Sequence, residues 1–109
     1  MILPFCCYVL FSESDRMLYI GYSTDLIQRL TSHNNGKVQS TKSRLPLKLI
    51  FCEYYLFKQD AMRRESYFKT TAGKKTIRLM LHETLLKLGY KATELSITSD
   101  LELEIKHED

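Results

Sequence analysis

Apolar and polar residues alternate in two short runs near the start of the chain, at residues 6–12 and 17–22. Both runs are rich in aromatic and β-branched side chains, and the polar stretch 13–16 separates them. This pattern predicts a β-hairpin with a short loop. Because successive side chains of a strand point to opposite faces, the pattern also assigns Tyr8 and Tyr19 to defined faces of their strands. A hairpin can bring these two tyrosines close together, in a register that the pattern leaves open.

The segment after the hairpin has the pattern of a helix. Leucines recur with helical spacing over residues 25–33, which predicts a helix there. Ser23 or Thr24 is expected to cap its N-terminus. Asp25 favours the first turn, because an acidic group is stabilised near the positive end of the helix dipole. Residues 34–36, which read Asn-Asn-Gly, end the helix with residue types that tolerate a left-handed backbone.

The following residues predict one more strand and two more helices. The stretch 37–44 is polar and basic and lacks apolar periodicity, so it is expected to be a loop. An apolar run predicts a third strand at 47–55. Helical spacing then predicts helices at 58–71 and 74–88, with a break at Gly73 between them.

Signals of regular structure become weak after Tyr90. Gly89 is expected to end the last helix, and residues 101–105 alternate like an edge strand. The 109 residues, 44% of them hydrophobic, suffice for one domain with a modest core. We therefore expect a single domain at residues 1–93, followed by an acidic tail at 94–109.

Neither a membrane span nor a leader is expected. No segment approaches the roughly 20 apolar residues that a membrane helix needs. Residues 1–5 are apolar, but the run is short, lacks a basic leader and contains proline, which does not fit a signal peptide.

The three cysteines, Cys6, Cys7 and Cys52, contain no CxxC pair. Adjacent cysteines in a strand point to opposite faces, so Cys6 and Cys7 would chelate a metal poorly. Cys7 or Cys52 as a nucleophile stays open, but small buried apolar residues are the favoured interpretation. This cysteine usage indicates a reducing, cytosolic compartment.

The net charge of +3 hides an asymmetry between the two parts of the chain. Residues 1–93 hold 15 Lys and Arg against 7 Asp and Glu, a charge of +8; residues 94–109 hold one Lys against six acids, a charge of −5. One interpretation is a solvated surface with a frayed tail. The other is a basic body that binds a polyanion, with a tail that competes for the same surface.

Five residues have side chains suited to the hydrolysis of a phosphodiester: Tyr8, Tyr19, Arg29, His33 and Glu65. Phenols can relay protons, a guanidinium matches phosphate oxygens with a two-pronged contact, and a carboxylate holds a hard cation. Each residue alone has an ordinary structural explanation, such as a core aromatic or a surface cation. Their joint spacing makes the functional interpretation specific.

Glu65 is the most informative single residue of this set. In the predicted helix it lies four residues after Ala61 and three before Phe68, on the apolar stripe. A carboxylate there needs a partner, because burial of an unpaired charge costs several kcal/mol. The partner is either a metal ion or a cation of the chain, such as Arg29. Taken alone, the helix pattern favours the internal salt bridge.

The combined motifs resemble those of the GIY-YIG nuclease superfamily, particularly its small stand-alone bacterial members. The resemblance covers roughly residues 5–81 and rests on Cys6-Cys7-Tyr8, Tyr19-Ile20-Gly21, Arg29-Leu30, His33-Asn34, Leu45-Pro46-Leu47 and Arg63-Arg64-Glu65. It implies an α+β fold with a small three-stranded antiparallel sheet flanked by helices. Such a sheet agrees with the predicted hairpin and third strand.

Two departures from the family pattern affect the interpretation. The first triplet keeps only its tyrosine, with Cys6 and Cys7 in place of Gly and Ile. The asparagine that many members carry after the metal-binding glutamate has no clear equivalent in residues 70–75. Lys69 or Lys74 could take its place, or the contact is absent.

The resemblance implies a catalytic role for each of the five residues. Glu65 would be the protein carboxylate on one divalent cation, Mg²⁺ or Mn²⁺, which keeps several waters and takes phosphate oxygens as further ligands. Arg29 would hold the phosphate as charge builds in the transition state. Tyr19 is the preferred acceptor of a proton from the attacking water, with Tyr8 positioning or relaying. His33 either positions the phosphate or takes the role of base itself.

The expected partner is a nucleic acid, with DNA favoured over RNA, and not a membrane. The expected contacts position the phosphate backbone without reading sequence, and they are Lys37, Lys42, Arg44, Arg63, Arg64, Lys69, Lys74, Lys75 and Arg78. Two alternatives remain: a nucleic-acid-binding module of the same fold without turnover, and an interaction domain in which Glu65 and Arg29 form an internal pair.

Overall fold

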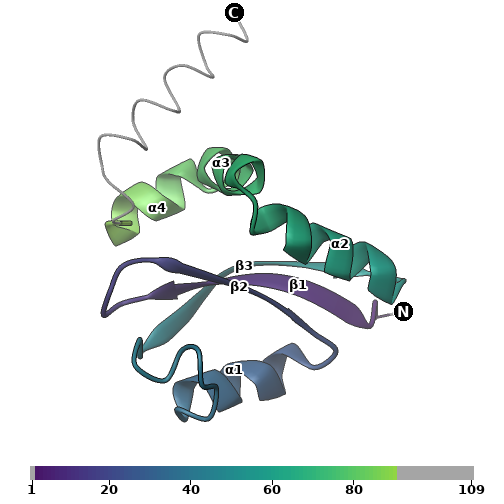
Figure 1. Ribbon diagram of the computed structural model, residues 1–109, viewed down its shortest axis with the longest axis horizontal. Coiled ribbons are helices and arrows are strands. Elements are labelled where there is room, and N and C mark those ends of the chain that lie inside the picture. The colour runs from purple at the N-terminus through teal and green to yellow at the C-terminus, as the bar shows by residue number, and fades with distance from the viewer. Residues whose placement is uncertain (1, 91–109) are drawn as a thin grey trace, which may run out of the picture.

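A three-stranded antiparallel sheet with the strand order β2-β1-β3 lies at the centre of the structure. The computed structural model describes residues 2–90. Its elements follow the order β1 (Phe5–Ser12), β2 (Leu18–Ser23), α1 (Leu26–Asn34), β3 (Leu47–Tyr55), α2 (Lys58–Phe68), α3 (Thr71–Met80) and α4 (His82–Leu88). Helix α1 lies on one face of the sheet, and α2, α3 and α4 lie on the other (Figure 1). The predicted α+β fold and its three strands are confirmed.

The central strand β1 separates two hydrophobic cores. Cys7 and Val9 pack with Phe68 and Ile77 on the face that carries α2 and α3. Cys6, Tyr8 and Leu10 pack on the opposite face, with leucines of α1 and β3. Because β1 is buried on both faces, it reads as a nearly continuous run of apolar residues.

The register of the hairpin brings the two tyrosines to the same face. Tyr8 is paired with Gly21, and Tyr19 with Leu10, so the tyrosines are diagonal neighbours across β1 and β2. The ring of Tyr8 crosses the backbone of Gly21. A Cβ atom at this glycine would lie 2.4 Å from both Cζ and Oη of Tyr8, closer than atoms can approach. Glycine at position 21 therefore makes room for the phenol.

Helix α1 begins one residue later than expected. Its N-cap is Asp25, whose carboxylate accepts a hydrogen bond from the backbone N–H of Gln28 at 3.1 Å. The expected cap at Ser23 or Thr24 is wrong. The hydroxyl of Ser23 instead accepts from the backbone N–H of Asp25 at 2.9 Å, which holds the turn before the helix.

The boundary between α2 and α3 also differs from the expectation. Helix α2 ends at Phe68, and Thr70 caps α3 by accepting a hydrogen bond from the backbone N–H of Gly73 at 3.0 Å. Gly73 is thus inside the first turn of α3 and does not break it. A Cβ atom there would lie 1.8 Å from the carbonyl oxygen of Tyr67, so the glycine permits close contact between the end of α2 and α3.

The long helix expected at 74–88 is two helices. Leu81, with φ −113° and ψ 30°, lies between α3 and α4. Leucine is a good helix former, so no residue at this junction predicts that the helix ends there. Gly89 ends α4 in the left-handed conformation with φ 73°, as expected.

The tail at 94–109 and the edge strand expected at 101–105 lie outside the described residues. Among residues 2–90, no helix has the length and apolar character required to cross a membrane.

Candidate active site

The structure brings Tyr8, Tyr19 and His33 together on the face of the sheet covered by α1. The hydroxyl of Tyr8 lies 3.0 Å from Nε2 of His33. The ring of Tyr19 packs edge-on against that of His33 with centroids 5.0 Å apart, and the two tyrosine rings are 6.4 Å apart. The diagonal pairing of β1 and β2 positions the phenols, and the last turn of α1 positions the imidazole.

Tyr8 is fully buried. Burial raises the pKa of its hydroxyl to about 12, although the neighbouring Arg29 guanidinium opposes this rise. The phenol therefore keeps its proton at neutral pH. Its contact with His33 supplies the hydrogen-bond partner that a buried hydroxyl needs.

His33 is fully buried as well, between Tyr8 and Thr41. Its Nδ1 lies 2.8 Å from Oγ1 of Thr41. Burial lowers the pKa of the imidazole, and the positive charge of Arg29 lowers it further, so the ring is neutral at pH 7. A neutral imidazole has one donor and one acceptor nitrogen. When Nδ1–H donates to Thr41, Nε2 accepts from Tyr8.

Thr41 is the member of this chain of contacts that the sequence did not reveal. It lies in the stretch expected to be a loop, where no periodicity distinguishes it from its neighbours. Its burial depends on the path of the loop beneath the sheet, for which the sequence carries no signal.

Arg29 lies beside both phenols. The hydroxyl of Tyr8, and to a smaller extent that of Tyr19, raises the pKa of its guanidinium. A polar cavity of about 280 Å³ opens next to it, lined by Ser23, Thr24, Asp25, Gln28, Arg29 and Ser32. Hydroxyl groups beside a guanidinium form a suitable environment for phosphate oxygens.

Glu65 lies on α2, which packs on the face of the sheet opposite α1. Its carboxylate is among the charges that raise the pKa of Tyr8, after the larger effect of burial. The side chain is 20% exposed and pairs with Nζ of Lys69 at 3.3 Å, one helical turn away. Among the described residues this is the ion pair of Glu65; it does not pair with Arg29.

The pair of Glu65 with Lys69 leaves the carboxylate accessible to a cation. Lys69 is 57% exposed and contacts only Oε2 of the carboxylate, at 3.3 Å. Carboxylate oxygens suit Mg²⁺ or Mn²⁺, both hard cations. Within residues 2–90, no three His, Cys, Asp or Glu side chains converge as a metal cage. Glu65 therefore fits a cation that is held by one carboxylate and completed by water and substrate oxygens.

The nine basic residues expected along nucleic acid differ in their surroundings. Lys37, Lys42, Lys74 and Lys75 are exposed. Four others lie in ion pairs: Arg44 with Asp15, Arg63 with Asp60, Arg64 with Glu53, and Lys69 with Glu65. Arg78 is half-buried and contacts Tyr90.

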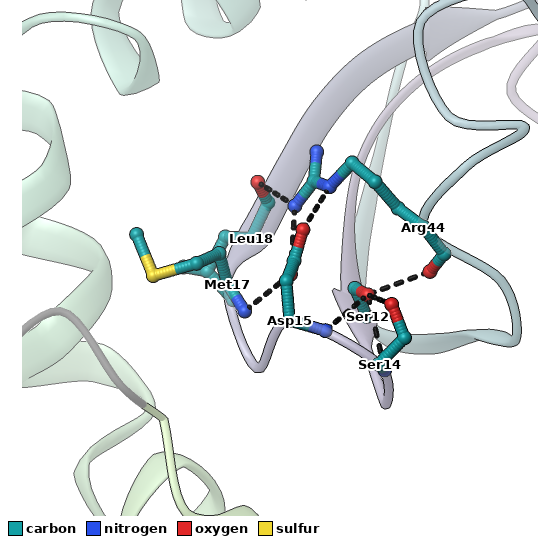
Figure 2. A network of polar contacts seen from close by, with 6 residues as sticks. All are labelled: Ser12, Ser14, Asp15, Met17, Leu18 and Arg44. Atoms are coloured by element: carbon teal, nitrogen blue, oxygen red, sulfur yellow. Dashed lines mark hydrogen bonds and ion pairs between the residues drawn. The ribbon is translucent and has the colours of Figure 1, made fainter.

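Two of these arginines are held firmly within the fold. The guanidinium of Arg64 also stacks on the ring of Phe68, 4.3 Å from its centroid. Arg44 belongs to the network of polar contacts at the hairpin loop shown in Figure 2. Both are less available to phosphates than the exposed lysines.

Two of the three cysteines are buried structural residues, and Cys52 is partly buried. Cys6 and Cys7 are buried, and burial raises the pKa of the Cys6 thiol to about 11 and that of Cys7 to about 12. A thiol with such a pKa is protonated at neutral pH and is a poor nucleophile. The described cysteines are all free of disulfides.

Comparison with known proteins identifies the domain type. The family model for the GIY-YIG catalytic domain matches residues 4–78. A UPF0213 protein of Streptococcus agalactiae is 49% identical over 67 residues, which are 61% of this chain and 75% of the relative. The UPF0213 protein YsiG of Lactococcus lactis is 43% identical over 75 residues, 68% of this chain and 72% of YsiG. The matched region spans β1 to most of α3 and includes Tyr8, Tyr19, Arg29, His33 and Glu65. The chain belongs to the GIY-YIG family.

Proposed function

We propose that this protein is a metal-dependent endonuclease that hydrolyses phosphodiester bonds in DNA. The observation that carries the proposal is the hydrogen bond between Tyr8 and His33, 3.0 Å long, with Tyr19 and Arg29 beside it. A packed core does not require two buried polar side chains in contact next to a cation. Such an arrangement suits a site that moves a proton beside a bound phosphate.

The two buried side chains provide a path for the proton of the attacking water. Tyr8 holds its own proton and can give it to Nε2 of His33 as it receives one from water. Neutral His33 can accept that proton, and the second contact, to Thr41, keeps the ring oriented. This arrangement favours His33 as the final acceptor, with Tyr8 as relay. Tyr19 then orients the water or accepts its proton directly.

Arg29 couples the binding of phosphate to this proton transfer. Its charge lowers the pKa of His33 in the free protein. A phosphate bound to the guanidinium would offset that charge and make the imidazole a better base. The same guanidinium would stabilise the additional negative charge of the transition state, while the hydroxyls of Ser23, Thr24 and Ser32 line the space for phosphate oxygens.

Glu65 would hold the divalent cation of this reaction. When bound, such a cation polarises the scissile phosphate and stabilises the leaving oxygen. The ε-amino group of Lys69 is the group that must move aside or turn toward the substrate. DNA would lie along the exposed lysines, which contact phosphates without reading bases.

The proposal is tested by incubating the protein with Mg²⁺ or Mn²⁺ and a panel of duplex, flapped, branched and single-stranded DNA. We expect cleavage by the wild type and none by Glu65→Gln, which keeps the shape of the side chain and removes its charge. Glu83→Gln is the matched control, because Glu83 is an exposed acid of α4 and should have no effect on cleavage. Wild-type cleavage that persists in Glu65→Gln would disprove the metal assignment.

One observation favours a second candidate, a nucleic-acid-binding module without turnover. Lys69 pairs with one oxygen of the carboxylate that would bind the metal, and the family's asparagine has no clear equivalent in residues 70–75. The same assay separates the two functions: a binding module shifts DNA in a gel with either cation but leaves every substrate of the panel intact.

A further inference from the structure

The loop between α1 and β3 is polar, yet it delivers a fully buried side chain to the site. Thr41 is completely buried, and its hydroxyl contacts Nδ1 of His33. Ordering such a segment costs backbone conformational entropy. Contacts elsewhere must therefore hold the loop in place.

A tight turn links Thr41 to Arg44. The backbone N–H groups of Thr41 and Lys42 both donate to the carbonyl oxygen of Val38, at 3.1 and 2.9 Å. The N–H of Arg44 then donates to the carbonyl oxygen of Thr41 at 2.8 Å. Whatever fixes the position of Arg44 thus also fixes that of Thr41.

Arg44 is attached to the β1–β2 hairpin at three points (Figure 2). Its guanidinium contacts both carboxylate oxygens of Asp15 and donates to the carbonyl oxygen of Leu18 at 3.1 Å. Its own carbonyl oxygen accepts from the hydroxyl of Ser12 at 2.6 Å. A further backbone bond, from Glu13 N–H to the carbonyl oxygen of Pro46 at 3.0 Å, joins the same two segments.

Asp15 is itself rigidly placed. Its carboxylate accepts from the backbone N–H of Met17 at 2.9 Å, and its own N–H donates to Ser12 at 3.1 Å. The side chains of Arg44 and Asp15 are 22% and 37% exposed. A two-pronged arginine–carboxylate contact of this kind fixes geometry better than an exposed pair of single contacts.

We propose that Asp15 and Arg44 are positioning residues for the site: their ion pair fastens the α1–β3 loop to the hairpin and so holds Thr41 against Nδ1 of His33. The inference rests on the proposed function, and it identifies the residues that hold the proton-accepting imidazole in place. Neither residue touches the reacting atoms. They act through Thr41, which sets the orientation of the imidazole toward Tyr8.

Asp15→Asn is the informative substitution, because it separates positioning from DNA binding. Because residues 1–93 carry a net positive charge, removal of an acid strengthens their attraction to a polyanion. A loss of kcat without a rise in KM therefore cannot come from a lost phosphate contact. Arg44→Gln should have the same effect on kcat, and the double variant should lose no more than either single one, since both break the same link. We expect kcat to fall about tenfold in each single variant and in the double variant.

NMR of the His33 imidazole tests the positioning without reference to cleavage. Apart from Thr41, the titratable and charged groups that face this ring are Tyr8 of β1, Tyr19 of β2 and Arg29 of its own helix. None of them is altered by the substitutions. In the wild type we expect one tautomer and a pKa below the usual value. In Asp15→Asn and Arg44→Gln we expect mixed tautomers and a pKa closer to about 6.5 as water enters.

The matched control is the ion pair of Arg63 with Asp60, whose side chains are 74% and 52% exposed on α2. Asp60→Asn should leave the imidazole signals unchanged. Thr41→Val keeps the β-branched shape of the side chain and removes the hydroxyl that contacts His33. It should therefore reproduce the NMR change even if Arg44→Gln fails to fold. An unchanged imidazole spectrum in folded Asp15→Asn or in Thr41→Val overturns the inference. If the wild type cleaves nothing, the proposed function fails while the NMR result still decides the positioning role.

Discussion

At the scale of single residues, the contact between Tyr8 and His33 joins two groups that burial keeps uncharged. Burial raises the pKa of one and lowers that of the other, so neither ionises near neutral pH in the free protein. Arg29 is the charged neighbour of both. The arrival of a phosphate at this arginine is therefore the event that can change the proton affinity of the pair.

Arg29→Ala should reduce turnover much more than DNA affinity. Loss of a donor that stabilises transition-state charge typically lowers the rate about 10²–10³-fold. Lys42→Ala is the contrasting variant, because Lys42 is an exposed cation of the loop and should weaken binding and flatten its salt dependence. Single-turnover rates and binding titrations over a range of salt measure the two effects. Equal effects of both substitutions on binding alone would contradict this division of roles.

All five candidate site residues were singled out from the sequence, and periodic elements indicated how four of them lie. Strand alternation assigned Tyr8 and Tyr19 to faces of their strands without fixing the register, and helical spacing put Arg29 and His33 one turn apart. The contact of His33 with Thr41 could not be predicted, because it depends on a turn in an irregular segment. The partner of Glu65 was also open, and the structure provides Lys69 rather than Arg29.

At the scale of elements, strands were easier to predict than helix boundaries. The limits of β1, β2 and β3 follow from apolar runs that lie between polar turns. The start of α3 follows instead from one hydrogen bond of Thr70 and from the proximity of Tyr67 to Gly73. Glycine is a common helix terminator, so sequence alone suggested a break where the structure has a close helix contact.

Glycine at position 73 could serve to break a helix or to allow close contact between α2 and α3. Gly73→Ala distinguishes these two roles by the sign of its effect on stability. Alanine in place of glycine within a helix ordinarily stabilises it by about 0.5–1 kcal/mol. Here the added methyl group would meet the carbonyl oxygen of Tyr67, so we expect destabilisation by about 1–3 kcal/mol or more. Thermal and urea melts measure the change. A more stable variant would show that α2 and α3 do not pack as closely as described.

At the scale of the whole molecule, charge is divided between the two parts of the chain. Residues 1–93 carry +8 and residues 94–109 carry −5. The positive potential of the body attracts phosphates, and an acidic segment on the same chain reduces that potential.

Removal of residues 94–109 should raise DNA affinity at low salt. The gain should shrink as ionic strength rises, because exposed charges are screened beyond about 8 Å at physiological salt. Binding curves at several salt concentrations, paired with melting curves, test this expectation. A lower melting temperature with unchanged affinity would mean that the apolar residues at 101–105 belong to the fold and that the segment has no regulatory role.

The close packing of Tyr8 over Gly21 also constrains how this protein can evolve. The two residues belong to different strands and different halves of the family's motif. The ring of Tyr8 nevertheless fills the space that a side chain at position 21 would need. No larger residue fits at position 21 while the phenol keeps its place. Divergence at position 21 therefore has to follow or accompany the loss of the tyrosine, and the two positions are expected to change together across lineages.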